Sequence, residues 1–181
     1  MKYFYDTEFI EDGKTIDLIS IGVVREDGRT FYAISTEFKA KRASQWVKDN
    51  VLIHLPERYA TPPPYGSPNA FEKSMAWMDR KTIKADLLRF IGDDAPEWWG
   101  YYSAYDHVAL CQIFGTMMDL PEGWPFYTRD LKQWADELGV DLSERVPQET
   151  EHHALADAQW NKKAYEYLVE ISLPKFRQSA A

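Results

Sequence analysis

Three hydrophobic segments open the chain and predict three consecutive strands. Residues 2–9 are rich in Tyr and Phe, which favour strands. Residues 17–26 form a near-continuous apolar run, and residues 29–36 follow after Asp27-Gly28, which is a strong hairpin turn signal. With a first turn near Asp12-Gly13, the pattern predicts three leading antiparallel strands.

Further along the chain, predicted helices alternate with one more predicted strand. Ile83, Leu87 and Ile91 recur at helical spacing in residues 79–91, with Asp79 as the N-cap and Gly92 after the last turn. The pattern also predicts an aromatic strand at 97–103 and helices at 40–52 (with Trp46 and Val47 inward), 106–114, 129–138 and 154–171. Leading antiparallel strands followed by alternating strands and helices predict an α/β fold with a mixed sheet covered by helices.

One segment breaks this regular pattern. Residues 54–78 contain Pro62-Pro63-Pro64 and, shortly afterwards, a run of glycine, serine, proline and asparagine. Such composition is typical of a long loop or an insertion. We therefore expect a single domain over 1–181 with a proline-rich loop at about 54–78, and we expect 62–69 to be mobile or near the substrate path rather than in the core.

The composition narrows the functional classes. The chain has 181 residues and a formal net charge of −8, which excludes binding to nucleic acid through an overall basic surface. No run of about 18 apolar residues predicts a membrane span, and no apolar segment typical of a signal peptide follows Met1. The single cysteine, Cys111, cannot form an intrachain disulfide, so we expect a cytoplasmic protein.

Two carboxylates are candidates for chemistry on the first strand. Asp6 and Glu8 are two residues apart, so on a strand both side chains point to the same face. Two acids on an aromatic strand are costly to bury unless a cation joins them. The alternative is that the strand lies at the edge of the sheet and both acids are solvated.

Two further acids and a histidine pair lie at the ends of other predicted elements. Asp106 follows the aromatic strand, and its alternative role is a helix N-cap. Asp157 lies near the start of the last helix, five residues after His152 and four after His153, and its alternative role is a helix-dipole partner. Taken together, the acids and the histidine form one constellation: acid-x-acid on a strand, acid after a later strand, then His and acid on the last helix.

This order resembles that of the DEDDh 3′-5′ exonucleases of the ribonuclease-H-like superfamily. The matching motifs are DTE at 6–8, AYD at 104–106 and HHALAD at 152–157, where His153 stands in place of a usual Asp. Longer stretches at 3–13, 20–24 and 104–112 resemble the mycobacterial branch of polyadenylate-specific 3′-exoribonucleases. The resemblance runs from residue 1 to about 171 and implies a ribonuclease-H-like fold.

The resemblance also implies a two-metal phosphodiester hydrolase. Two Mg²⁺ ions, or Mn²⁺ in their place, would be held by carboxylates, which are the hard oxygen ligands that both ions prefer. The family pattern implies that Asp6 bridges the ions, that Glu8 and Asp157 complete the ion with the attacking water, and that Asp106 supports the second. Phe9 is a candidate for stacking on the terminal base, with core packing as its alternative.

The resemblance and the residue spacing disagree on the general base. In a continuous helix His153 and Asp157 share one face, whereas His152 and Asp157 are roughly 140° apart. The family pattern instead implies His152 as the base, which requires the helix to begin only near His153 or Ala154. Pro147 and the polar run at 148–151 make a late start plausible, so we predict His152.

The sequence therefore favours a metal-dependent 3′-5′ exoribonuclease. The partner would be an RNA 3′ end, single-stranded or an overhang and possibly adenylate-rich, and the resemblance implies a homodimer. One alternative is a DNA 3′-5′ exonuclease, because no motif identifies contacts to a 2′-hydroxyl. A second is a catalytically silent nucleic-acid-binding module on the same fold.

Overall fold

The computed structural model describes residues 1–58, 76–148 and 152–178, with side chains described as far as residue 172. The predicted mobile stretch at 62–69 lies outside these residues. The strands are β1 (Lys2–Glu11), β2 (Ile16–Arg25), β3 (Thr30–Ser35), β4 (Trp77–Met78), β5 (Glu97–Gly100) and β6 (Arg129–Asp130). The α-helices are α1 (Gln45–Asn50), α3 (Arg80–Ile91), α4 (Ala104–Phe114), α5 (Leu131–Leu138), α6 (Leu142–Arg145) and α7 (Ala154–Gln178).

The described strands form one mixed sheet in the order β4-β3-β2-β1-β5-β6. The three leading strands pair antiparallel, whereas β5 joins β1, β6 joins β5 and β4 joins β3 in parallel. This arrangement confirms the predicted mixed α/β sheet. β1 is an interior strand, but β5 pairs only with Lys2–Phe4, so at Asp6 and Glu8 the described strand neighbour is β2 alone. Both acids are half-buried rather than fully solvated.

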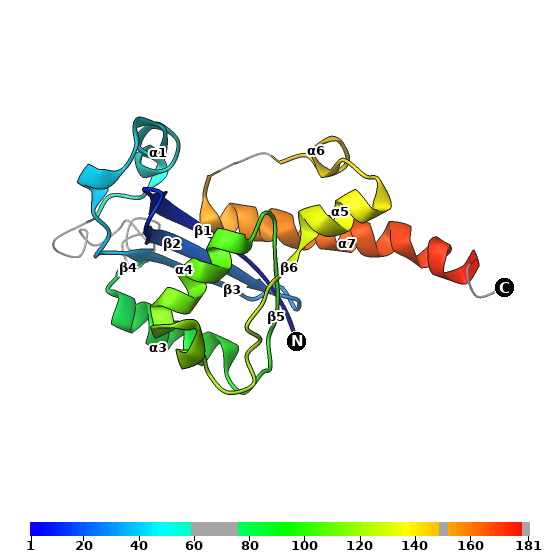
Figure 1. Ribbon diagram of the computed structural model, residues 1–181, viewed down its shortest axis with the longest axis horizontal. Coiled ribbons are helices and arrows are strands. Elements are labelled where there is room, and N and C mark those ends of the chain that lie inside the picture. The colour runs from blue at the N-terminus through cyan, green and yellow to red at the C-terminus, as the bar shows by residue number, and fades with distance from the viewer. Residues whose placement is uncertain (59–75, 149–151, 179–181) are drawn as a thin grey trace, which may run out of the picture.

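Helices cover both faces of the sheet (Figure 1). On one face, Ile83 and Leu87 of α3 and Leu110 of α4 pack against the buried Tyr3 and Tyr5 of β1. On the other face, Ala158 of α7 packs against the buried Phe4 of the same strand. None of the helices in the described part of the chain is long and apolar enough to cross a membrane.

The alternation of β1 decides where its carboxylates point. Tyr3 and Tyr5 lie on the face covered by α3 and α4, and Phe4 lies on the face covered by α7. Asp6 and Glu8 continue the face of Phe4, because side chains on a strand alternate. A register shift between Glu8 and Phe9 ends this alternation. The two acids therefore point toward the N-terminal end of α7.

Gly22 sets how closely α7 approaches the sheet. Gly22 pairs with Asp6 across the β1–β2 ladder. A Cβ built at Gly22 would lie 2.3 Å from the carbonyl oxygen of Ala154 and 2.4 Å from the Cα of Leu155. Only glycine leaves room for backbone at that distance, so the first turn of α7 lies directly on the sheet beside Asp6.

The predicted helix at 40–52 is wrong. The segment instead contains the 3-10 helix Ala40–Arg42, the short helix α1, and a second 3-10 helix, Leu52–His54. Ser44 caps α1 by accepting a hydrogen bond from the backbone N–H of Val47. Val47 packs against a small apolar cluster as predicted, but Trp46 is 54% exposed rather than inward.

Several predicted boundaries shift by a few residues. The predicted loop at 54–78 includes a short strand at its end, because Trp77 and Met78 pair with β3. The aromatic strand ends at Gly100, and α4 begins at Ala104 with Ser103 before it, so Asp106 is not the N-cap. Asp130 caps α5 by accepting hydrogen bonds from the next turn, which moves that helix start to Leu131. The short helix α6 lies between α5 and Pro147, where the sequence pattern predicts no element.

Candidate active site

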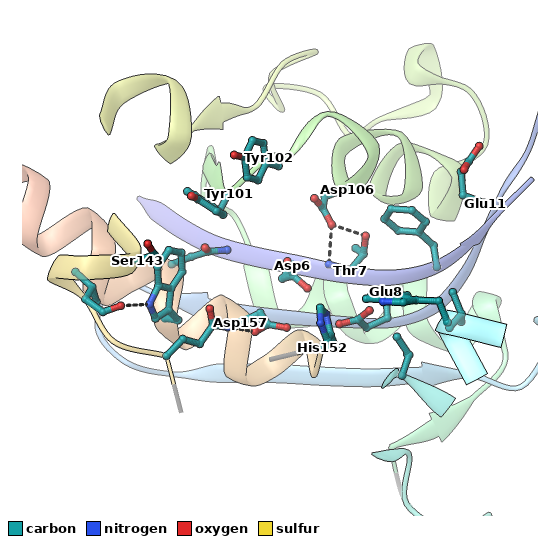
Figure 2. Close-up of a pocket in the computed structure, with 18 of the residues that line it drawn as sticks. Asp6, Thr7, Glu8, Glu11, Tyr101, Tyr102, Asp106, Ser143, His152 and Asp157 are labelled. Carbon is teal, nitrogen blue, oxygen red and sulfur yellow. Dashed lines mark hydrogen bonds between the residues drawn. The ribbon is translucent and has the colours of Figure 1, made fainter. Parts of the chain in front are cut away.

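An open cavity of about 850 Å³ lies where β1, the β5–α4 turn, α1 and the start of α7 meet (Figure 2). All six site residues predicted from the sequence line it. The six residues are Asp6, Glu8, Phe9, Asp106, His152 and Asp157. Segments far apart in the sequence therefore contribute to one site.

Three of the carboxylates form a tight group. One oxygen from each of Asp6, Glu8 and Asp157 lies within 4.8 Å of the other two. The first two come from β1 and the third from the first turn of α7, which Gly22 admits to the sheet. Asp157 also accepts hydrogen bonds from the backbone N–H of His153, at 2.9 Å, and from the side-chain amide of Gln148. These contacts fix its carboxylate toward β1.

Asp106 lies at the edge of this group rather than within it. Its Oδ1 accepts hydrogen bonds from the backbone N–H of Thr7, at 2.8 Å, and from the Thr7 hydroxyl, at 2.6 Å. Thr7 points to the face of β1 covered by α4, so the contact joins that helix to the strand that carries Asp6 and Glu8. The second carboxylate oxygen of Asp106, Oδ2, takes part in neither of these two bonds.

Burial and mutual repulsion make the carboxylates reluctant to ionise together. Burial is the main cause that raises the pKa of Asp6 well above its ordinary range, and the neighbouring carboxylates raise it further. The same causes raise the pKa of Glu8 to about 8. Burial raises the pKa of Asp106 to about 6, although the hydrogen bonds from Thr7 oppose the rise.

The donor set fits divalent cations. Three carboxylate oxygens within 4.8 Å of one another are hard ligands of the type that divalent cations prefer. A bound cation would also relieve the repulsion that raises the pKa values of Asp6 and Glu8. Asp6, Glu8 and Asp157 are therefore the residues that could hold a metal ion.

The two histidines lie in different environments. Because α7 begins at Ala154, His152 lies before the helix, lines the cavity and contacts the Trp46 ring edge to face at 4.8 Å. His153 is not part of the cavity lining; its ring stacks on Tyr32, with ring centroids 4.8 Å apart, and its Nδ1 accepts a bond from the N–H of Ala156. Helix α7 therefore begins at Ala154, which is the late start that a His152 base requires.

Phe9 is half-buried and lies outside the buried core clusters. It lines the cavity and contacts Tyr105 of α4 edge to face at 5.9 Å. Sequence reasoning missed several other lining residues, above all Trp46, Tyr102 and Gln148. No motif identifies them, because each reaches the cavity from a turn or a short helix whose position depends on the tertiary fold.

The sheet order and the carboxylates at the interior strand define a ribonuclease-H-like fold. Escherichia coli Exonuclease I, solved in complex with a 5cy-dT13 oligonucleotide, matches it with a TM-score of 0.54 at 14% identity. That match covers 96% of this chain, which spans 41% of Exonuclease I.

The protein-family model described as the 3′-5′ exoribonuclease Rv2179c-like domain matches residues 65–169. The 3′-5′ exoribonuclease Rv2179c of Mycobacterium tuberculosis strain H37Rv is 48% identical over 161 residues, which cover 87% of each chain. The 3′-5′ exoribonuclease MT2234.1 of strain CDC 1551 matches equally well. The chain belongs to the Rv2179c-like 3′-5′ exoribonuclease family.

The raised pKa values predict how stability varies with pH when divalent cations are absent. Because Glu8 and Asp6 hold protons more tightly in the folded than in the unfolded protein, the free energy of unfolding should fall as the pH rises from about 5 to about 8. Asp6→Asn removes one of the repelling charges. It should therefore raise the free energy of unfolding at pH 8 by on the order of 1 kcal/mol, which is about one pKa unit of coupling.

Urea unfolding in EDTA at pH 5, 6.5 and 8 measures this effect. Asp86→Asn, which changes an acid outside the cavity, is the control and should follow the wild-type pH dependence. A wild-type protein that becomes more stable between pH 5 and pH 8, or an Asp6→Asn variant destabilised at pH 8, would contradict the prediction.

Proposed function

We propose that the protein is a metal-dependent 3′-5′ exoribonuclease that hydrolyses RNA from its 3′ end. The observation that carries the proposal is the group formed by Asp6, Glu8 and Asp157, which lies in an open cavity beside His152. Both Mycobacterium tuberculosis relatives are named 3′-5′ exoribonucleases, and these names support the reaction and its direction. The matching family model carries the same activity in its name, and it is named after Rv2179c.

The metal-binding roles follow the donor set. Asp6, Glu8 and Asp157 would hold one divalent cation, and Asp6 with Asp106 would hold a second, directly or through water. Mg²⁺ is the proposed ion, with Mn²⁺ as a substitute, because both take carboxylate oxygens. The bound ions would supply an acidified water and a stabilised leaving oxygen for in-line phosphodiester cleavage.

The protein's own groups would move the proton. His152 would accept the proton of the attacking water as that water forms the new P–O bond, and the O3′ of the preceding nucleotide would leave. The products are a nucleoside 5′-monophosphate and an RNA shortened by one nucleotide. His152 suits this role because it precedes α7 and reaches the cavity beside Glu8 (Figure 2).

The remaining features concern the substrate and the assembly. Phe9 lines the cavity and is the proposed stacking contact for the terminal base. The cavity is open, which suits a single-stranded 3′ end or an overhang. The proposed preference for adenylate and the proposed homodimer follow from the sequence resemblance.

Matched RNA and DNA oligomers test the proposed function. With Mg²⁺, 5′-labelled single-stranded RNA should give a ladder that shortens one nucleotide at a time, and DNA of the same sequence should be degraded more slowly. EDTA should abolish the ladder. Asp6→Asn should lower the rate by a factor of at least 10³, since the change removes the proposed bridging ligand; Asp86→Asn should remain active.

Degradation of DNA at the RNA rate or faster would favour a deoxyribonuclease. Binding of RNA without degradation in Mg²⁺ or Mn²⁺ would favour a silent binding module. Either result contradicts the proposed activity, as would an Asp6→Asn variant that retains near-normal activity while folded.

A pair of alanine variants tests the proposed base. His152→Ala should lower kcat by about 10²–10⁴-fold at saturating Mg²⁺, which is typical for loss of a general base. His153→Ala should retain most of kcat and lose some stability, because its ring packs on Tyr32 and its Nδ1 accepts a bond at the start of α7. The larger kcat loss in His153→Ala would mean that His153 is the base.

A further inference from the structure

Among the described residues, only two other than glycine have a positive φ: Tyr102 at 55° and His152 at 62°. Both line the cavity that holds the carboxylates, and in Figure 2 they lie on opposite sides of Asp6. A bulky residue rarely adopts this backbone conformation. Such strain persists only where the surrounding structure fixes it, and it gathers at functional sites. His152 has a proposed role, whereas Tyr102 has none.

The backbone around Tyr102 is fixed by its neighbours. Ser103 is fully buried, and its backbone N–H and hydroxyl donate to Asp130 Oδ2 at 2.7 and 3.2 Å. Gly100 pairs with Asp130 between β5 and β6, and a Cβ at Gly100 would lie 2.6 Å from the Cβ of Ser103. The chain therefore makes a tight turn into α4, and this turn imposes the positive φ on Tyr102. Glycine would adopt this conformation without strain.

The Tyr102 side chain contributes little buried surface to the fold, so packing does not explain the strained backbone. Its side chain is 65% exposed. One side of the ring is supported, because Tyr101 packs against it edge to face at 4.7 Å and in turn packs against Trp160 of α7 at 5.0 Å. The fold thus presents a supported aromatic ring to the cavity at a position where burial does not require one.

We propose that Tyr102 stacks on a base of the RNA substrate, as a second stacking contact besides Phe9. The inference rests on the proposed function. Phe9 contacts Tyr105, whereas Tyr102 contacts Tyr101, so the two candidate contacts belong to separate aromatic groups. A ring that is already held in place loses little conformational freedom on binding, which favours its use as a stacking surface. Stacking tolerates every base, so this contact would strengthen binding without selecting adenine.

The test combines protein variants with abasic RNA. Wild type, Tyr102→Ala and Tyr102→Phe are assayed for removal of the first nucleotide from single-stranded oligoadenylate in Mg²⁺. The same RNA with one abasic ribose, placed at the terminal or at the penultimate nucleotide, is assayed in parallel. Tyr127→Ala is the matched control, because Tyr127 is 59% exposed and lies outside this cavity.

Loss of one base-stacking contact weakens binding by a factor of about 5 to 150. Tyr102→Ala should lower kcat/KM on intact RNA by a factor in that range, mainly by raising KM, while Tyr102→Phe and Tyr127→Ala stay near wild type. At one of the two abasic positions wild type should lose a similar factor, and Tyr102→Ala should lose nothing further. This lack of additivity identifies a direct contact between ring and base.

Wild-type kinetics for Tyr102→Ala would overturn the inference. So would a loss of kcat/KM in Tyr102→Ala that is the same on intact RNA and on both abasic RNAs. A third contradicting result is a KM for Tyr102→Phe that is raised as much as that of Tyr102→Ala. Tyr102→Gly guards against a folding defect, since glycine suits the positive φ; it should melt at or above the wild-type temperature while showing the raised KM. Failure of wild type to shorten any RNA would instead reject the proposed function itself.

Discussion

The site depends on the close contact between Gly22 and the first turn of α7. The backbone of Ala154 and Leu155 lies where any larger residue at position 22 would place its Cβ. Because Gly22 is the ladder partner of Asp6, this contact brings the N-terminal turn of α7 beside the strand that carries Asp6 and Glu8. Asp157 then joins the two strand carboxylates, and His152 lies on the segment just before the helix.

The same contact forces like charges together. Burial and mutual repulsion raise the pKa values of Asp6 and Glu8, so the cluster opposes folding at neutral pH when no cation is bound. The structure offsets part of this cost through hydrogen bonds: Thr7 donates twice to Asp106, and Asp157 accepts from the backbone of His153. These bonds orient the carboxylates, which would preorganise them for the proposed metal ions.

The sequence predicts most of the sheet and the shared face of Asp6 and Glu8, because both depend on local rules. The period-two alternation of a strand is enough to place Asp6 and Glu8 on one face, and cap residues such as Asp79 mark helix boundaries. The proposed roles of His152, Asp106 and Asp157 rest on the family resemblance rather than on spacing. Spacing alone favours His153. Both histidines precede α7, and tertiary contacts distinguish them, because His152 lines the cavity beside Trp46 whereas the His153 ring stacks on Tyr32.

The cavity walls could not be predicted, because they depend on tertiary contacts. Residues 40–52 have an apolar pattern compatible with one helix, yet capping by Ser44 and the 3-10 turns on either side leave a short α1 with Trp46 facing His152. The positive φ of Tyr102 follows from hydrogen bonds to Asp130, a residue nearly thirty positions away in the chain. No sequence motif marks either aromatic residue.

The central claim is that the carboxylates of β1, α4 and α7 hold the divalent cations needed for RNA hydrolysis. The most direct test is titration with Mn²⁺, in which electron paramagnetic resonance reports the free ion, with adenosine 5′-monophosphate present as the product. Wild type should bind two ions per chain in competition with Mg²⁺, and Asp6→Asn should lose both, because Asp6 is the proposed ligand common to the two. An Asp6→Asn variant that is folded and binds as many ions as wild type would contradict the account.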